Sequence, residues 1–195
     1  MKVEPGNPKY DSRNNCNAIF ETVNNTLVYG CRTTIIPNNV TSLSGYAFYY
    51  CSDLTSITIP NGVTSIGKYA FYYCNGLTSV TIGNNVTSIG EYAFYYCDGL
   101  TSVTVLNPTP STISSYTFKN RTNATLYVPQ GSKSAYEAAK YWKEFKEVIE
   151  IDPSGIDQIM SNGQNNATIF TLDGKRISKP QKGINIINGK KVVIN

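Results

Sequence analysis

A period of 23 residues runs through the middle of the chain and constrains its fold more than any other feature. Cysteine recurs with this spacing at Cys51, Cys74 and Cys97. Alanine, phenylalanine, leucine and valine share the period, at Ala47, Ala70 and Ala93, Phe48, Phe71 and Phe94, Leu54, Leu77 and Leu100, and Val40, Val63 and Val86. Such a period predicts a solenoid, in which each unit buries its apolar face only against its neighbours. Solenoids present extended surfaces far more often than they enclose reaction centres.

Each unit predicts two short strands and one helical turn. In the first strand, Leu-x-x-Ile-x-Ile, Ile57 and Ile59 alternate inward and leave Ser56 and Thr58 facing outward. A turn and a second strand, Val-x-x-Ile-Gly, come next. The segment Tyr-Ala-Phe-Tyr-Tyr-Cys then has apolar residues at helical spacing, so we expect a single helical turn with the tyrosines on its opposite face. The predicted fold class is therefore mostly β with short helical turns.

The sequence divides into three parts. Residues 1–34 form an atypical leading unit that reads as a hairpin, and we expect that a leader and further repeats precede it. Residues 35–151 hold the solenoid and end in a capping helix, N-capped by Ser132 and reaching about Tyr141. Residues 152–195 begin with a linker and continue as a small antiparallel β domain, because Asp-Gly and Asn-Gly turns join its apolar runs.

Composition excludes several classes of function. The chain has no histidine, the commonest general base and metal ligand, so we expect no catalytic residues, no metal site and no cofactor. Between residues 36 and 105 the charged residues are few: Asp53, Lys68, Glu91 and Asp98. Nucleic-acid binding needs clustered Lys and Arg, which these repeats lack. No apolar run reaches the length of a membrane span. We therefore expect a monomer with no enzymatic activity, nucleic-acid partner or transmembrane segment.

Two sets of repeated positions are candidate binding surfaces. The first is a stripe of tyrosines, which Tyr116 would extend: Tyr46, Tyr49, Tyr50, Tyr69, Tyr72, Tyr73, Tyr92, Tyr95 and Tyr96. Tyrosine supplies a large contact area at low entropic cost, and the alternative is a purely structural ladder of stacked rings. The second is the hydroxyl face of the first strands, for which the alternative is solvated β-sheet: Ser56, Thr58, Ser79, Thr81, Ser102 and Thr104.

The five cysteines fall into two classes. Cys51, Cys74 and Cys97 stand between a phenylalanine and a leucine of the repeat, so we expect them in the core as small hydrophobic residues. Cys16 and Cys31 stand outside the repeat and bracket the predicted hairpin, which would bring its ends together. We therefore expect a disulfide between these two in an oxidising compartment.

The unit L-x-x-I-x-I-P-x-x-V-x-x-I-G-x-x-A-F-x-x-C resembles the BspA-like leucine-rich repeat of bacterial surface proteins, over about Val3 to Ile151. The segment TLYVPQGSKSAYEAAKYWKEFKEVIEI is similar to the C-terminal cap of that family. The tail IFTLDGKRISKPQKGINIINGKKVVIN is similar to sorting or anchoring domains of secreted proteins from the same bacterial group. The resemblance implies a leucine-rich-repeat solenoid in a secreted or surface-exposed protein that binds host proteins, matrix proteins or other cells. It carries over no catalytic residue.

Two functions are open at this stage. One is a non-enzymatic module for protein–protein interaction or adhesion that uses a repeat surface. The other is a carbohydrate-binding module, in which the aromatic faces of the tyrosines hold sugar rings. In both cases the partner is extracellular, a protein or a glycan, and the sequence does not identify it.

Overall fold

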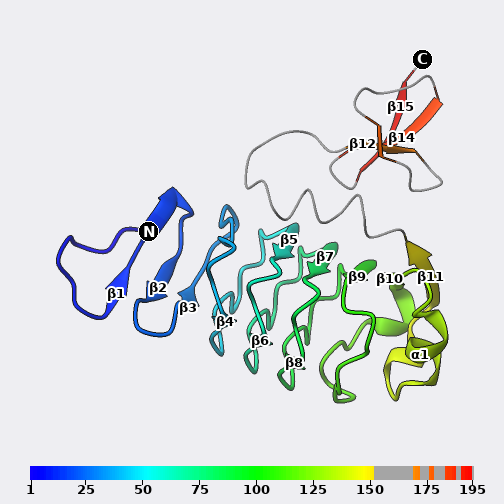
Figure 1. The fold of residues 1–195 in the computed structure, drawn as a ribbon, viewed down its shortest axis with the longest axis horizontal. Coiled ribbons are helices and arrows are strands. Elements are labelled where there is room, and N and C mark those ends of the chain that lie inside the picture. The colour runs from blue at the N-terminus through cyan, green and yellow to red at the C-terminus, as the bar shows by residue number, and fades with distance from the viewer. Residues whose placement is uncertain (152–168, 172–175, 178–182, 188–189, 195) are drawn as a thin grey trace. The chain divides into compact units, whose positions relative to one another are not determined.

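The computed structural model describes residues 1–151 throughout and, beyond them, strands at 169–171, 176–177, 183–187 and 190–194. The chain separates into two compact units, Met1–Glu150 and Ile151–Asn195. In the first unit, short strands stand side by side from the N-terminal hairpin to the last repeat, as Figure 1 shows. The repeats seen in the sequence are therefore successive layers of one stack.

A five-stranded sheet forms one side of the first unit, in the order β11-β10-β9-β7-β5. Its strands are β5 (Ser56–Ile59), β7 (Ser79–Ile82), β9 (Ser102–Val105), β10 (Thr125–Pro129) and β11 (Glu147–Ile151). The repeat strands pair in parallel, and Ser56 lies opposite Ser79, which lies opposite Ser102. Equivalent residues of neighbouring repeats are thus direct neighbours, because the chain returns to the same sheet after each period.

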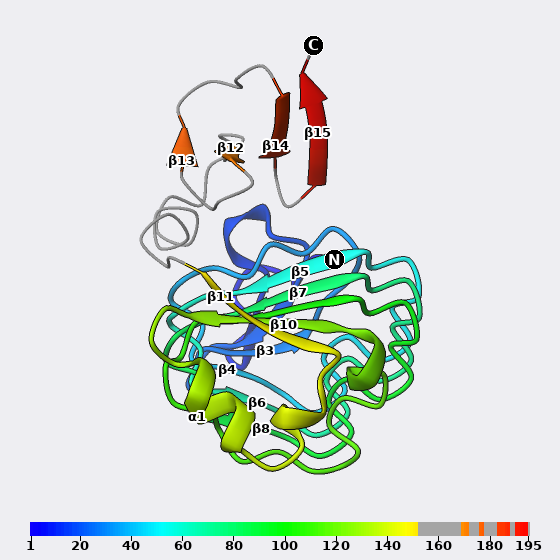
Figure 2. The same ribbon diagram turned by 90° about the vertical axis from the view of Figure 1, so that its right-hand side faces the viewer.

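A second sheet lies across the core from the first, as the end-on view in Figure 2 shows. It follows chain order: β1 (Tyr10–Asp11), β2 (Ile19–Glu21), β3 (Thr26–Tyr29), β4 (Ser42–Leu43), β6 (Ser65–Ile66) and β8 (Ser88–Ile89). The first three strands pair antiparallel, whereas β3, β4, β6 and β8 pair in parallel. The N-terminal hairpin therefore joins the repeats directly, through the pairing of β3 with β4.

Repeated apolar side chains fill the space between the sheets. In β5, Ile57 and Ile59 are buried while Ser56 and Thr58 are exposed, so the alternation read from the sequence is confirmed. One phenylalanine per repeat forms a continuous stack, with ring centroids 4.8, 4.9 and 4.7 Å apart along Phe48, Phe71, Phe94 and Phe118. All four rings are at most 1% exposed, so each core ring packs on its own counterpart in the next repeat.

The repeated cysteines belong to this core. Cys74 and Cys97 are buried, and Cys51 is partly buried. The Cys74 thiol donates to the Phe48 carbonyl oxygen at 3.0 Å, and the Cys97 thiol donates to the Phe71 carbonyl oxygen at 3.1 Å. The hydrogen bond with Cys74 and then burial raise the pKa of the Cys97 thiol above its usual range. These thiols therefore act as small core groups that also bond neighbouring repeats.

After β10, the helix α1 (Lys133–Ala138) and the 3-10 helix η3 (Trp142–Glu144) pack on the last repeat. Trp142 and Phe145 are buried, and each ring centroid lies 5.6 Å from that of Phe118. The Trp142 indole N–H donates to the Ser111 carbonyl oxygen at 2.7 Å. The phenylalanine stack thus continues into aromatic rings of the C-terminal segment. None of the helices in the described part of the chain has the length and apolar content that crossing a bilayer requires.

The helix is shorter than the sequence predicted. It ends at Ala138 instead of about Tyr141, because Ala139 already takes an extended conformation with φ of −77° and ψ of 134°. An α-helix cannot continue through a residue with extended dihedral angles. Ser132 stands at the N-cap as expected, but its hydroxyl donates to the Pro129 carbonyl oxygen instead of accepting from a helix amide.

The second unit contains strands β12 (Ile169–Thr171), β13 (Arg176–Ile177), β14 (Gly183–Ile187) and β15 (Lys190–Ile194). They pair antiparallel in the order β13-β12-β14-β15, with Ile184 opposite Val193. The turn dipeptides and the linker predicted from the sequence lie outside the described residues.

Candidate functional site

The repeated segment Tyr-Ala-Phe-Tyr-Tyr-Cys forms successive tight turns, where the sequence predicted one helical turn. The Tyr49 N–H donates to the Tyr46 carbonyl oxygen at 3.1 Å, which closes one such turn. The Tyr50 N–H donates instead to the Tyr72 carbonyl oxygen of the next repeat, at 2.9 Å. The segment is therefore held partly by its neighbour and does not follow a helical bonding pattern.

Left-handed backbone at the tyrosines explains why the helical turn does not form. Six tyrosines of the repeats have φ between 58° and 65°: Tyr46, Tyr50, Tyr69, Tyr73, Tyr92 and Tyr96. This conformation is rare for a bulky side chain and costs about 1–3 kcal/mol at each position. The same two positions carry it in each of the three full repeats, so contacts between repeats have to offset it.

The tyrosines form one aromatic surface, the tyrosine stripe, made of columns that run along the stacked repeats. The columns are Tyr46–Tyr69–Tyr92–Tyr116, Tyr49–Tyr72–Tyr95 and Tyr50–Tyr73–Tyr96. Rings within a column stack with centroids 4.4–5.9 Å apart and planes within 8–23°. Adjacent columns meet edge to face, as at Tyr46 and Tyr49, 5.3 Å apart and 73° inclined. Stacked and edge-to-face pairs both stabilise the array beyond simple burial.

Exposure is greatest at the two ends of the stripe. The four most exposed rings are Tyr46 at 51%, Tyr49 at 43%, Tyr50 at 56% and Tyr116 at 45%. The tyrosines between them are half-buried, because neighbours cover both ring faces. Loss of water and then the neighbouring phenols raise the pKa of Tyr72 and of Tyr73, so these side chains stay neutral at physiological pH.

A lysine lies against the middle of the stripe. The Lys68 ammonium is 5.3 Å from the centroid of the Tyr69 ring and 5.6 Å from that of Tyr92. It also pairs with Glu91 at 2.9 Å, and this hydrogen bond raises the pKa of Lys68. A cation of the chain itself therefore already lies close to the rings of the stripe.

A second lysine covers the end of two columns. Lys119 follows Phe118 in the last repeat, where the preceding repeat has Tyr95 after Phe94. Its ammonium lies 4.1 Å from the centroid of the Tyr96 ring and 5.2 Å from that of Tyr95. A positive charge thus takes the place that the next ring of the stack would occupy.

The hydroxyl face lies on the outer side of β5, β7 and β9. Its residues are exposed in β5 and half-buried in the next two strands: Ser56 and Thr58, Ser79 and Thr81, and Ser102 and Thr104. Strand register aligns the serines in one row and the threonines in another. The structure therefore gathers each predicted set into a continuous surface, the tyrosines on turns and the hydroxyls on strands.

Cys16 and Cys31 are free thiols in the structure, without the expected disulfide. The Cys16 thiol donates to the Arg13 carbonyl oxygen at 2.8 Å, whereas the Cys31 thiol donates to the Asn17 carbonyl oxygen at 3.4 Å. The pairing of β2 and β3 shifts register by one residue between Ile19 and Phe20, so the hairpin does not keep one register toward the two cysteines. Burial raises the pKa of the Cys16 thiol.

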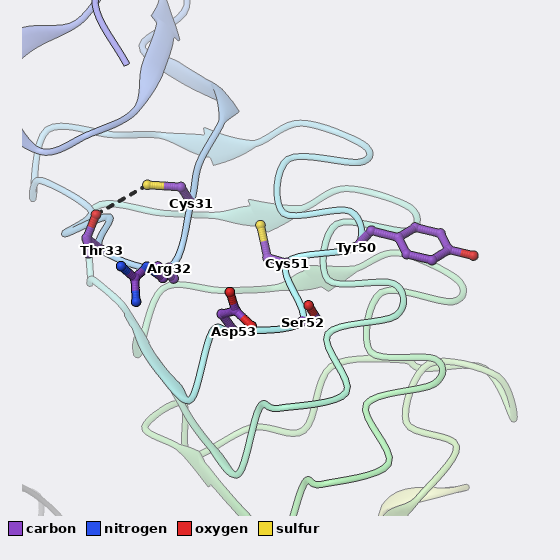
Figure 3. A pocket seen from close by; sticks show the side chains of 7 residues that line it. All are labelled: Cys31, Arg32, Thr33, Tyr50, Cys51, Ser52 and Asp53. Atoms are coloured by element: carbon purple, nitrogen blue, oxygen red, sulfur yellow. Dashed lines mark hydrogen bonds between the residues drawn. The ribbon is translucent and has the colours of Figure 1, made fainter.

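A hollow of about 380 Å³ lies where the leading unit meets the first full repeat, as Figure 3 shows. One wall is the segment Cys31, Arg32 and Thr33. The other wall is the segment from Tyr50 to Asp53. The hollow therefore borders the open end of the Tyr50 column.

Residues 21–143 match the family model described as the BspA type leucine-rich repeat region, in six copies. The chain belongs to this family. No curated protein matches the BspA-type chain.

Three solved structures are similar to this BspA-type chain. The pneumococcal vaccine antigen PcpA is 17% identical over 76% of the chain, with a TM-score of 0.45, and the chain spans only 49% of that protein. The leucine-rich repeat protein TpLRR of T. pallidum is 12% identical over 80% of the chain and 89% of its own, with a TM-score of 0.46. A leucine-rich cell surface protein of Faecalibacterium prausnitzii A2-165 is 24% identical over 75% of the chain and 46% of its own, with a TM-score of 0.43.

Sequence reasoning missed the hollow and the role of Lys119 in this BspA-type chain. The signal for Lys119 was present, because the last repeat keeps its phenylalanine and changes the next residue from tyrosine to lysine. The sequence indicated the hollow only indirectly. The leading unit has no counterpart of the Tyr-Tyr-Cys segment, so the tyrosine columns could not continue into it as further tyrosine rings.

Proposed function

We propose that this chain is a non-enzymatic protein-interaction module of a secreted or surface-exposed protein, and that the tyrosine stripe is its contact surface. The observation that carries the proposal is the ordered array of half-exposed tyrosine rings on a rigid stack of repeats. Membership of the BspA-type family supports the placement at a surface. The expected partner is an extracellular protein, and the module acts as a monomer.

The physical chemistry of the stripe suits a protein partner. Tyrosine buries a large apolar area while its hydroxyl keeps a hydrogen bond, and it is enriched in interface hot spots. Rings that are already stacked lose little rotamer freedom when a partner covers them. The hydroxyl face is the alternative contact surface, but its short side chains offer less apolar area.

A carbohydrate-binding module is the alternative function, and the stacking of the rings weighs against it. Sugar rings bind to the open face of an aromatic ring. In this stripe the inner ring faces are covered by neighbouring tyrosines 4.4–5.9 Å away. Open faces are therefore confined to the column ends, which leaves little room for an extended glycan.

The test is a binding screen of the whole chain against immobilised extracellular-matrix proteins and glycans. Two matched variants then locate the surface: Tyr49, Tyr72 and Tyr95 changed to Ser, or Thr58, Thr81 and Thr104 changed to Ala. We expect a protein ligand, and we expect the tyrosine variant to lose binding while the threonine variant keeps it. Circular dichroism confirms that both variants are folded.

Two results would count against the proposal. If the tyrosine variant binds like the wild type while the threonine variant does not, the stripe is structural and the strand face is the contact surface. If the chain binds only to the immobilised glycans in the screen, the carbohydrate-binding alternative replaces the protein-interaction function.

A further inference from the structure

Two cysteines line the same hollow, the one between the leading unit and the first full repeat. Cys31 stands in one wall and Cys51 in the other, and both are partly exposed. At the equivalent position of the next two repeats, Cys74 and Cys97 are buried. Cys51 is therefore the member of the repeated set that a small molecule in the hollow can reach.

The Cys51 thiol lies against the backbone immediately before Cys31. Its sulfur is 3.7 Å from the Gly30 carbonyl oxygen. Standard backbone dimensions place a carbonyl oxygen about 2.8 Å from the next Cα atom, so the Cys51 sulfur lies within about 6.5 Å of the Cys31 Cα atom. Disulfides join cysteines whose Cα atoms are about 4.4–6.8 Å apart. Rotation about the two Cα–Cβ bonds moves sulfur atoms over the distance that such a bond requires.

Weak contacts hold the Cys31 and Cys51 thiols in their present positions. Figure 3 shows the Cys31 thiol turned toward Thr33, and its sulfur is 3.4 Å from the Thr33 hydroxyl oxygen. The same sulfur is 3.4 Å from the Asn17 carbonyl oxygen. A thiol is a weak donor, so these long contacts oppose little rotation of the Cys31 side chain toward Cys51.

The two thiols of the hollow differ in acidity. Burial raises the pKa of the Cys31 thiol, but hydrogen bonds from Thr33 and Thr34 outweigh burial and leave this pKa below its usual value. Burial, and then the charges of Cys74 and Cys31, raise the pKa of the Cys51 thiol to about 11. The thiolate is the nucleophile in disulfide exchange. Cys31 is therefore the group that attacks first, and Cys51 is the group that attacks second.

Cys16 is the competing partner for Cys31, since the sequence predicted a disulfide between these two. Its side chain is 6% exposed, and its thiol donates to the Arg13 carbonyl oxygen at 2.8 Å. This contact is much shorter than the 3.7 Å contact of the Cys51 thiol. The Cys16 thiol is therefore held more firmly and is less accessible than the Cys51 thiol.

We propose that Cys31 and Cys51 form a disulfide that links the leading unit to the first full repeat, with a small-molecule disulfide as the oxidant. The Cys31 thiolate attacks one sulfur of the reagent, forms a mixed disulfide and releases one thiolate. The Cys51 thiolate then attacks the Cys31 sulfur, forms the new bond and releases the second thiolate. Two cysteines are oxidised, the reagent is reduced to two thiols, and the two cysteine protons reach the released thiolates through water. Neither step involves the tyrosine stripe, so the inference is independent of the proposed function.

The experiment exposes the reduced full chain to oxidised glutathione in native buffer and then blocks the remaining thiols with iodoacetamide. Cleavage after lysine, arginine and glutamate leaves each of the five cysteines on a separate peptide. We expect mass spectrometry to find residues 22–32 linked to residues 33–68 as the main disulfide. The bond closes a loop of about 20 residues, so the melting temperature should rise by roughly 5 °C or more.

Matched variants test the order of attack and the choice of partner. Cys51→Ser should stop at the mixed disulfide of Cys31 with glutathione and show no rise in melting temperature. Cys31→Ser should leave Cys51 unmodified or react at least about tenfold more slowly than the wild type. Cys16→Ser should form the bond between Cys31 and Cys51 as the wild type does.

Four results would overturn this disulfide. They are thiols that all stay free, a main product that links residues 14–21 to residues 22–32, a persistent mixed disulfide at Cys31 in the wild type, and an equal yield of the expected bond in chain unfolded by urea. The last result would show that the folded hollow does not direct the pairing. Far-UV circular dichroism of each variant before oxidation confirms that the comparison is made between folded proteins.

Discussion

At the scale of single residues, backbone conformation decides how the tyrosine stripe is built. Tyr50 and Tyr73 occupy a left-handed conformation that glycine or asparagine would adopt with less strain. The chain nevertheless has tyrosine there, and those rings stack 4.6 Å apart. The stacking energy and the bonds between repeats therefore offset a local cost that recurs in each of the three full repeats.

The inside and outside positions of one repeat differ in what they contribute to stability. Phe71 is fully buried between Phe48 and Phe94, so Phe71→Ala should lower the free energy of unfolding by about 3–5 kcal/mol. Tyr73→Asn loses ring stacking but relieves left-handed strain, so its loss should stay within about 1.5 kcal/mol. Urea unfolding followed by circular dichroism measures both. Equal losses would contradict the assignment of core and surface.

Gly67 and Gly90, at one position of the second and third repeats, allow neighbouring layers to approach closely. A Cβ added at Gly90 would lie 2.5 Å from the backbone nitrogen of Lys68 and 2.7 Å from the carbonyl carbon of Gly67. Backbone atoms cannot yield as a flexible side chain can, so Gly90→Ala should cost roughly 2 kcal/mol or more. The control is Ser44→Ala at the same position of the first repeat, where the hydroxyl donates to Val28 at 3.2 Å. Similar unfolding midpoints for the two variants would contradict this account.

At the scale of elements, the strands and the core were readable from the sequence, and the turns were not. The 23-residue period and the inward alternation of Ile57 and Ile59 predict parallel strands that pair in register. Only this register buries the equivalent apolar side chains of every repeat. The tyrosine segment was mistaken for a helical turn, since apolar spacing carries no information about the sign of φ. The register shift between β2 and β3 at Ile19 and Phe20 is likewise invisible to residue spacing.

The aromatic cluster after the last repeat should be a large contributor to stability. Trp142 is 1% exposed and contacts Phe118, Tyr136 and Phe145. Trp142→Ala should therefore lower the free energy of unfolding by about 3–5 kcal/mol. The exposed neighbour Lys143 provides the control, and Lys143→Ala should stay within about 0.5 kcal/mol. Guanidinium unfolding measures both, and a Trp142→Ala loss as small as that of the control would contradict the prediction.

The same cluster should make stability fall at alkaline pH. Burial raises the pKa of Tyr136, whose hydroxyl donates to the Asn107 carbonyl oxygen at 2.7 Å. Because the folded pKa lies above the unfolded value of about 10, this stabilisation is complete below pH 10 and is lost as pH rises further. Between about pH 9 and pH 11 the wild type should lose about 1.4 kcal/mol more than Tyr136→Phe. Parallel urea melts across that range test the difference, and identical pH dependence would refute it.

At the scale of the whole molecule, each layer of the first unit is supported by the layers beside it. Equivalent serines, phenylalanines and tyrosines meet across every boundary between full repeats. Stability in such a stack is approximately a sum of repeat terms and nearest-neighbour terms. The number of stacked repeats also sets the length of the tyrosine stripe. Each added repeat should therefore increase both the stability of the stack and the area of the proposed contact surface.

Inserting one more repeat tests this coupling between stack length, stability and surface. A second copy of residues 70–92 placed after Tyr92 keeps the period, so it should add one strand to each sheet and one ring to each tyrosine column. The denaturant m-value should rise by roughly 15%, in proportion to the surface that unfolding exposes, with no loss of unfolding free energy. The control is a copy of residues 70–80 alone, which breaks the period and sends the following strands to the wrong sheet. If both insertions lower stability equally, the repeats are not interchangeable layers, and the stripe cannot be treated as a surface that each layer extends.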